Sequence, residues 1–78
     1  MTKVKIYGAG SIGNHYAYAF RKRSWDVKIF DTDDKALTRM KKEIYPNRYG
    51  KWDPKIKLIN KDDNSFYDLI IIGTPPDT

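Results

Sequence analysis

The sequence contains no cysteine, one histidine and one glutamate, and it has no long apolar run. Without cysteine the chain can form neither a disulfide framework nor a thiolate metal site, and the lone His15 cannot build a histidine-rich one. A membrane-spanning helix needs about 20 consecutive apolar residues. Met1 leads into the first apolar segment without the features of a signal peptide. We therefore expect no metal, no membrane association and a cytoplasmic location.

The chain is short and basic. Its 78 residues suffice for one small domain, which excludes a two-lobed enzyme within this chain. The net charge of +5 permits an anionic partner, although small domains often carry such charge for solubility. Aromatic and basic residues alternate between Tyr45 and Trp52, as in single-stranded nucleic-acid platforms. Because this is one short loop, we expect its aromatic rings to anchor it over the helix or the sheet edge, with no nucleic-acid partner.

The hydrophobic pattern alternates between strands and helices. Short apolar segments predict strands at residues 4–7, 27–30, 56–59 and 69–72. Helical spacing predicts a helix from Ser11 to about Arg23, followed later by a second helix that starts at Thr32 or Asp33 and ends at Pro46. The first helix has one apolar face, formed by Ile12, Tyr16, Ala19 and Phe20. Residues 47–54 are expected to form a loop.

This order of elements predicts an α/β fold with a parallel sheet, right-handed crossovers and flanking helices. Residues 60–66 are too few for a crossover helix, so we expect a single turn there. We predict the strand order 3-2-1-4, for which these residues must span about three strand spacings, roughly 14 Å, and they are long enough to do so. The continuous apolar run at residues 69–72 is typical of a strand covered on both faces.

Between the first strand and the first helix lies Gly8-Ala9-Gly10-Ser11-Ile12-Gly13, a G-x-G-x-x-G run. The first glycine permits a tight turn, the second lets a pyrophosphate reach the backbone, and the third allows the helix to pack closely on the strand. The free N–H groups at the start of the helix then face the phosphates. The predicted pyrophosphate-binding residues are Gly8, Gly10, Ser11, Ile12 and Gly13.

Asp31 follows the second strand, 18 residues beyond Gly13, where a carboxylate can accept hydrogen bonds from an adenosine ribose. Its charge would repel a 2′-phosphate, so we expect NAD rather than NADP unless Lys35 or Arg39 shields it. A helix-capping role for Asp31 remains open, because Asp33 and Asp34 lie beside it. No lysine follows the third glycine, which excludes a P-loop, whereas an S-adenosylmethionine-binding domain remains an alternative.

The fourth apolar segment ends in Gly73-Thr74-Pro75-Pro76, which stops the strand and can form a stiff wall at the carboxyl end of the sheet. Together with the glycine run and Asp31, this ending resembles the Gfo/Idh/MocA oxidoreductases. The resemblance implies that residues 1–78 are the N-terminal segment of a Rossmann-type NAD-binding domain, an incomplete doubly wound fold whose substrate domain lies outside the chain. It also implies that Thr74 and Pro75 border the nicotinamide.

The family transfers hydride between nicotinamide and a sugar, polyol or related small-molecule substrate, and the resemblance implies this activity for the parent protein. Its Glu-Lys-Pro motif has no match here, so no catalytic residue is assigned and the chain alone is expected to be inactive. Where the family often has histidine, this chain has Tyr16, and we expect the preceding His15 to serve packing or helix positioning. The alternative is a non-catalytic dinucleotide-sensing module. We also expect self-association through an exposed sheet edge at residues 69–72.

Overall fold

The structure, a computed structural model, describes residues 1–73. Thr74 and Pro75, which we expect to border the nicotinamide, lie outside the described residues. Four parallel strands form one sheet in the order β3-β2-β1-β4, which confirms the predicted topology. The strands are β1 (Lys3–Tyr7), β2 (Asp26–Phe30), β3 (Lys57–Ile59) and β4 (Leu69–Ile72).

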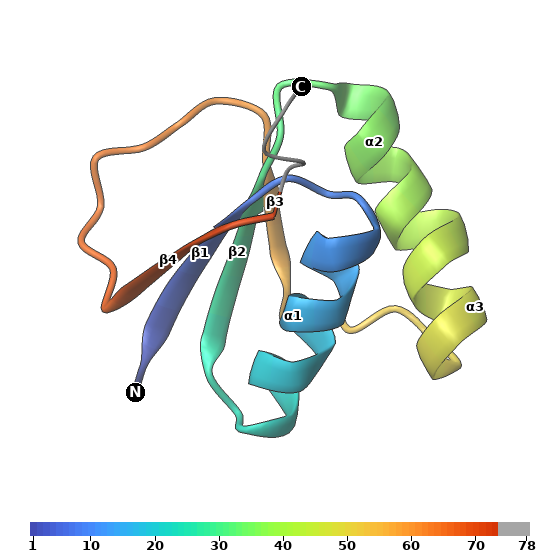
Figure 1. Ribbon diagram of the computed structural model, residues 1–78, viewed down its shortest axis with the longest axis horizontal. Helices are drawn as coiled ribbons and strands as arrows, with labels where there is room; N and C mark the ends of the chain where they lie inside the picture. Colours follow the sequence, from blue (N-terminus) through green and yellow to red (C-terminus); the bar gives the residue numbers. More distant parts are fainter. Residues whose placement is uncertain (74–78) are drawn as a thin grey trace.

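The helices cover one face of this sheet (Figure 1). They are α1 (Ser11–Lys22), α2 (Asp34–Arg39), a π-helical turn η1 (Met40–Ile44) and α3 (Tyr45–Tyr49). The arrangement confirms the predicted α/β class with flanking helices. Within residues 1–73, no helix has the length and apolar character needed to cross a membrane.

The core lies between the helices and the two central strands. Val4 and Ile6 of β1 and Val27 and Ile29 of β2 are fully buried, because alternate residues of each strand point toward the helical layer. Each such side chain contributes about 1.5 to 3 kcal/mol through burial. The second layer contributes further buried side chains, namely Leu37, Met40 and Tyr45. These contacts fix the helices against the sheet.

The face that α1 turns to the core differs from the prediction. Ile12 and Tyr16, two members of the expected apolar face, are 50% and 37% exposed, and the buried residues of α1 are instead Gly13, Asn14 and Ala17. A Cβ built on Gly13 would lie 2.1 Å from the carbonyl oxygen of Gly8. The helix therefore packs on the sheet through Gly13, Asn14 and Ala17, and Ile12 and Tyr16 lie toward its outer surface. Tyr18 and Phe20 are partly buried and pack against the core.

The predicted end of the second helix at Pro46 is wrong. Pro46 occupies the first turn of α3, and the chain stays helical through Tyr49. The π-helical turn before it makes this possible, because the N–H of Tyr45 donates to the carbonyl of Met40, five residues back. Proline is tolerated where a helical turn restarts, since its missing N–H is not needed there. The helix ends at Gly50, whose φ of 96° lies in the region that favours glycine.

The expected loop at residues 47–54 begins later, because Asn47–Tyr49 are helical. The expected anchoring of this aromatic stretch is confirmed. The ring of Tyr49 stacks on Tyr18 of α1 at 3.9 Å between centroids, and Tyr45 packs edge-on against Trp52 at 5.2 Å. These aromatic contacts bind α3 and the chain after it to α1.

Residues 60–68 cross from β3 to β4 over the sheet face opposite the helices (Figure 1). The expected single turn is instead an irregular segment with bends and no helix. It does not cover β4 fully, since Ile70 and Ile72 are 52% and 65% exposed within the described part of the chain. The expectation that this strand is covered on both faces is therefore wrong for residues 1–73.

Charged groups, not apolar ones, join this segment to the sheet. Lys5 of β1 is only 3% exposed and forms ion pairs with Asp62 and Asp63, and Lys28 of β2 pairs with Asp63 at 3.0 Å. Tyr67 also donates to Asp63, and this bond, followed by that from Lys28, holds the pKa of Asp63 well below its usual range. The ammonium of Lys5 likewise lowers the pKa of Asp62. A buried lysine is thus matched by two carboxylates.

Replacing Gly13 by alanine tests the contact between α1 and β1. We expect Gly13→Ala to lower the free energy of unfolding by roughly 3 kcal/mol, because the new methyl group would overlap the Gly8 carbonyl. Chemical denaturation followed by circular dichroism measures this change. Gly10→Ala is the control: its Cβ meets no atom within 4 Å, so stability should change by less than about 1 kcal/mol. Equal stability of the Gly13→Ala variant and the wild type would contradict the packing described above.

Asp62 and Asp63, which pair with Lys5, make the stability of the fold depend on pH. Their lowered pKa values stabilise the folded state above the usual aspartate range, near pH 4, and this contribution disappears as pH falls toward the folded-state values. Asp62→Asn should lower the melting temperature at pH 7 and flatten its decline between pH 6 and pH 3. Calorimetry over that range measures both. Glu43→Gln, which removes an exposed acid without an ion pair in residues 1–73, should leave the pH profile unchanged.

Candidate functional site

The glycine turn lies at the carboxyl end of β1, the strand at which the order of the strands in the sheet reverses. From β1 the chain builds β2 and β3 on one side, and it then crosses to place β4 on the other. Ligands of open α/β sheets bind at such a switch point. Gly8 has a φ of 114°, a conformation that favours glycine, and its N–H donates to the carbonyl of Phe30 at 2.8 Å. The turn therefore connects both central strands to the start of α1.

The N-terminus of α1 is open to solvent. Gly10 is its N-cap and provides no side-chain hydrogen bond, and the first turn contains no acidic residue. A Cβ on Gly10 would project into open space, so folding does not require glycine there, whereas a ligand approaching the backbone would. Ser11 and Ile12 are exposed at this end. Unpaired N–H groups and the positive end of the helix dipole together suit an anion.

Asp31 lies beside this turn, as its spacing predicts. One carboxylate oxygen accepts a hydrogen bond from the N–H of Ala9 at 3.1 Å, and the other accepts from the N–H of Asp33 at 2.9 Å. The capping role is taken by Asp33, whose side chain accepts from the N–H of Lys35. Asp31 keeps lone pairs for further hydrogen bonds. It lines a hollow of about 150 Å³ with Tyr7, Gly8, Phe30 and Thr32.

Two polar residues at the turn were not predicted from the sequence. Asn14 is fully buried, and its amide nitrogen donates to the carbonyls of Ala9 at 3.1 Å and Gly10 at 2.7 Å, which fixes the shape of the turn. Its side-chain oxygen has no partner among the described residues. Arg48 of α3 donates to both the carbonyl and the hydroxyl oxygen of Ser11. The sequence signal for Arg48 is its place in the aromatic and basic stretch, which gives no hint of its partner.

His15 is exposed on α1, and its ring meets the ring of Tyr16 edge-on at 6.1 Å. No described residue forms a hydrogen bond with its side chain, so its role in packing or helix positioning stays a prediction. Among residues 1–73, no three His, Cys, Asp or Glu side chains gather as metal ligands would. The chemistry available at the turn is therefore that of binding through amides, a carboxylate and a guanidinium.

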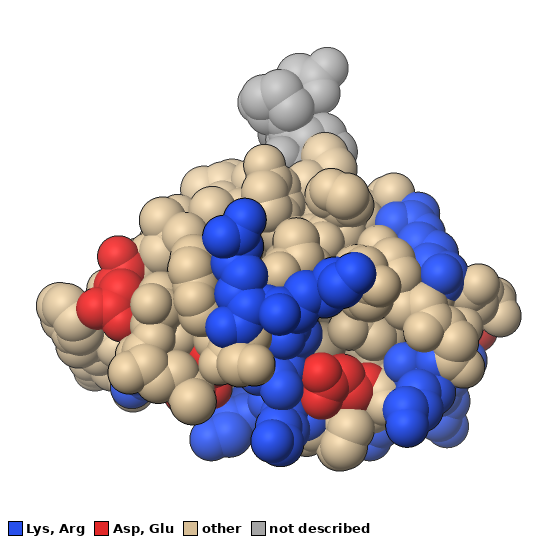
Figure 2. Space-filling model, turned by 90° about the horizontal axis from the view of Figure 1, so that it is seen from below, with Lys and Arg blue, Asp and Glu red and all other residues tan. Residues whose placement is uncertain are grey.

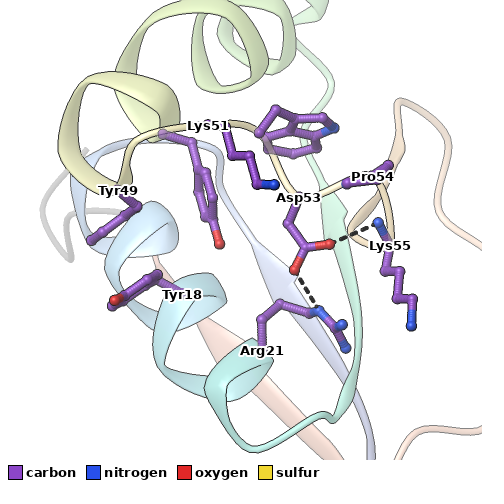
Figure 3. Close-up of a pocket in the computed structure, with 9 residues that line it drawn as sticks. Tyr18, Arg21, Tyr49, Lys51, Asp53, Pro54 and Lys55 are labelled. Carbon is purple, nitrogen blue, oxygen red and sulfur yellow. Dashed lines mark hydrogen bonds and ion pairs between the residues drawn. The ribbon is translucent and has the colours of Figure 1, made fainter.

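A second hollow, of about 380 Å³, lies among α1, α3 and residues 51–55 (Figure 3). One ion pair lines it: Arg21 donates to Asp53 at 2.9 Å, and Asp53 also accepts from the backbone N–H of Lys55. Arg21 donates in addition to the carbonyl of Trp25. We assign this hollow a structural role, because the ion pair and the aromatic rings that line it join α1, α3 and residues 51–55.

Basic side chains gather on the face shown in Figure 2, with acidic side chains among them. This view looks from below Figure 1, toward the ends at which β1 and β2 begin. The glycine turn lies at the opposite ends of these strands. The basic gathering in Figure 2 is therefore separate from the candidate site.

The comparisons with known proteins agree with this geometry. Residues 3–72 match the family model described as 3-hydroxyacyl-CoA dehydrogenase, NAD binding domain. No curated protein and no solved structure matches the chain. NAD is the cofactor of the matched family, which confirms the expected cofactor, whereas the resemblance to Gfo/Idh/MocA oxidoreductases finds no support. Since the match spans most of its length, the chain belongs to the NAD-binding domain family of the 3-hydroxyacyl-CoA dehydrogenases.

Proposed function

We propose that the chain is the cofactor-binding part of an NAD-dependent oxidoreductase. The diphosphate would bind the amides of Gly10, Ser11, Ile12 and Gly13, where Gly8 shapes the turn, and Asp31 would accept hydrogen bonds from the adenosine ribose. The observation that carries the proposal is the contact between the Asp31 carboxylate and Ala9, because it places the acid directly beside the uncapped start of α1. When bound, the nicotinamide accepts or donates hydride. The role of this chain would be to bind and orient the dinucleotide.

We propose a 3-hydroxyacyl thioester as the substrate class of the whole protein, on the strength of the family match. Its hydroxyl-bearing carbon would give hydride to NAD, and its hydroxyl proton would pass to a base outside this chain. A substrate domain beyond these residues, catalytic inactivity of the chain alone and a cytoplasmic location stay predictions. A sugar or polyol substrate finds no support in the comparisons, and the role of Thr74 and Pro75 at the nicotinamide stays untested.

The dinucleotide-sensing alternative uses the same glycine turn and the same acid, so these residues do not separate it from an enzyme. The family match favours the enzyme, because the family consists of dehydrogenase domains. It also favours NAD over S-adenosylmethionine, the other alternative.

Replacing Asp31 by asparagine tests the ribose contact. A hydrogen bond to a charged group contributes about 1.5 to 3 kcal/mol, so Asp31→Asn should weaken NAD binding roughly tenfold to a hundredfold. Loss of the negative charge should also narrow the preference for NAD over NADP. Calorimetric titration with both cofactors measures these changes. Asp34→Asn, on the neighbouring helix, is the matched control and should retain wild-type affinities. Equal binding of NAD and NADP by the wild type would contradict the role of Asp31.

We propose self-association through β4. Within residues 1–73 this strand has one neighbour, β1, and it exposes Ile70 and Ile72 along an open edge. Unpaired strand edges with apolar side chains favour pairing with another copy.

Ile72→Lys should therefore reduce self-association, because a charged side chain on this strand opposes the approach of a second copy. Light scattering over a range of concentrations measures the mass. Lys57→Ala on β3, at the other edge of the sheet, is the control and should leave the mass unchanged. A wild-type chain that stays monomeric at high concentration would overturn the proposal.

A further inference from the structure

We propose that Arg48, in the last turn of α3, is a diphosphate-binding residue whose side chain lies at the glycine turn. The inference rests on the proposed function, and it adds a cationic side chain to a site otherwise built from backbone amides. Dinucleotide recognition by the glycine run requires only a strand, a turn and a helix. The additional element is the guanidinium that the next helical segment brings to Ser11.

The contact with Ser11 leaves donors free for a ligand. Arg48 uses one N–H of Nη1 for the Ser11 carbonyl at 3.1 Å and one N–H of Nη2 for the Ser11 hydroxyl oxygen at 2.7 Å. Three of the five guanidinium donors remain. Because the hydroxyl oxygen of Ser11 accepts from Arg48, its own proton is free to donate outward. Both side chains are exposed, so these donors are accessible from solvent.

The electrostatics of this contact call for an anion. The positive end of the α1 dipole and the guanidinium of Arg48 meet at Ser11. Because both carry positive charge, they repel each other there. The first turn of α1 contains no acidic residue, and Arg48 has no ion pair within residues 1–73. A phosphate at this point would compensate both positive groups, and arginine suits phosphate because its planar fork can donate two parallel bonds.

The rest of α3 holds Arg48 in place. Its neighbour Tyr49 stacks on Tyr18 of α1 with nearly parallel rings (Figure 3). Tyr45, one turn earlier, is buried against Tyr18 and Trp52. The π-helical turn η1 determines the direction in which the side chains of α3 point, since one extra residue in a helix rotates the residues after it by about 100° around the helix axis. The arginine is therefore presented by a packed helical segment rather than by a free loop.

The test compares ligands with and without phosphate. NMR titrations of the full chain with NAD, ADP and adenosine measure binding to the wild type and to Arg48→Gln. We expect Arg48→Gln to weaken NAD and ADP binding about tenfold or more and to leave adenosine binding unchanged. The dependence of NAD affinity on salt should also become shallower. Arg48→Lys, which keeps the charge without the fork, should be intermediate.

Arg23→Gln is the matched control, because it removes one exposed arginine at the opposite end of α1 and should leave all three affinities unchanged. If Arg48→Gln binds ADP as the wild type does, the role of Arg48 is overturned while the proposed function stands. Equal weakening of adenosine and ADP would also overturn it, since Arg48 would then only support the fold. A wild type that binds neither NAD nor ADP would refute the proposed function and this inference together. Should Arg48→Gln fail to fold, the same ratio of ADP to adenosine affinity in Arg48→Lys decides.

Discussion

The close approach of α1 to β1 is the constraint on which the other features depend. Gly13 lies so near the Gly8 carbonyl that no side chain fits between them. This approach places the N-terminus of α1 at the carboxyl end of β1, where the order of the strands in the sheet reverses. It also leaves the amides of the first turn facing outward. The proposed anion site thus depends on packing, because a larger residue at position 13 would displace the helix and its dipole from the strand.

The two faces of the sheet are stabilised by different means. Toward the helices, apolar side chains such as Ile6 and Ile29 exclude water, which is the largest favourable contribution to folding. On the other face, Lys5 and Lys28 meet the carboxylates of Asp62 and Asp63. A buried ion pair must offset the cost of desolvation, so its stabilisation is smaller and depends on pH. We therefore expect acid to weaken the attachment of the irregular segment 60–68 to the sheet.

Helix α3 links the structural and functional parts of the molecule. Its aromatic residues pack on Tyr18, near the middle of α1, and its arginine reaches Ser11 at the beginning of the same helix. One short segment therefore contributes to the core and borders the proposed phosphate site. Rigid presentation matters, because a charged group fixed in advance loses less conformational entropy when a ligand binds. The hollow in Figure 3 belongs to this supporting layer, since the Arg21–Asp53 ion pair and the stacked tyrosines line it.

The sequence by itself determined the strand order, the glycine turn and the place of Asp31, because these follow from local patterns and from how far a short connection can reach. The motif recurs across dinucleotide-binding proteins, which is why it indicated NAD but not the matched family. Only the tertiary structure decided which face of α1 is buried, how Pro46 continues a helix, and that Arg48 meets Ser11. The buried face of α1 and the contact of Arg48 with Ser11 depend on packing between separate elements, which no local pattern encodes, and the helix continues past Pro46 through the π-helical hydrogen bond from Tyr45 to Met40.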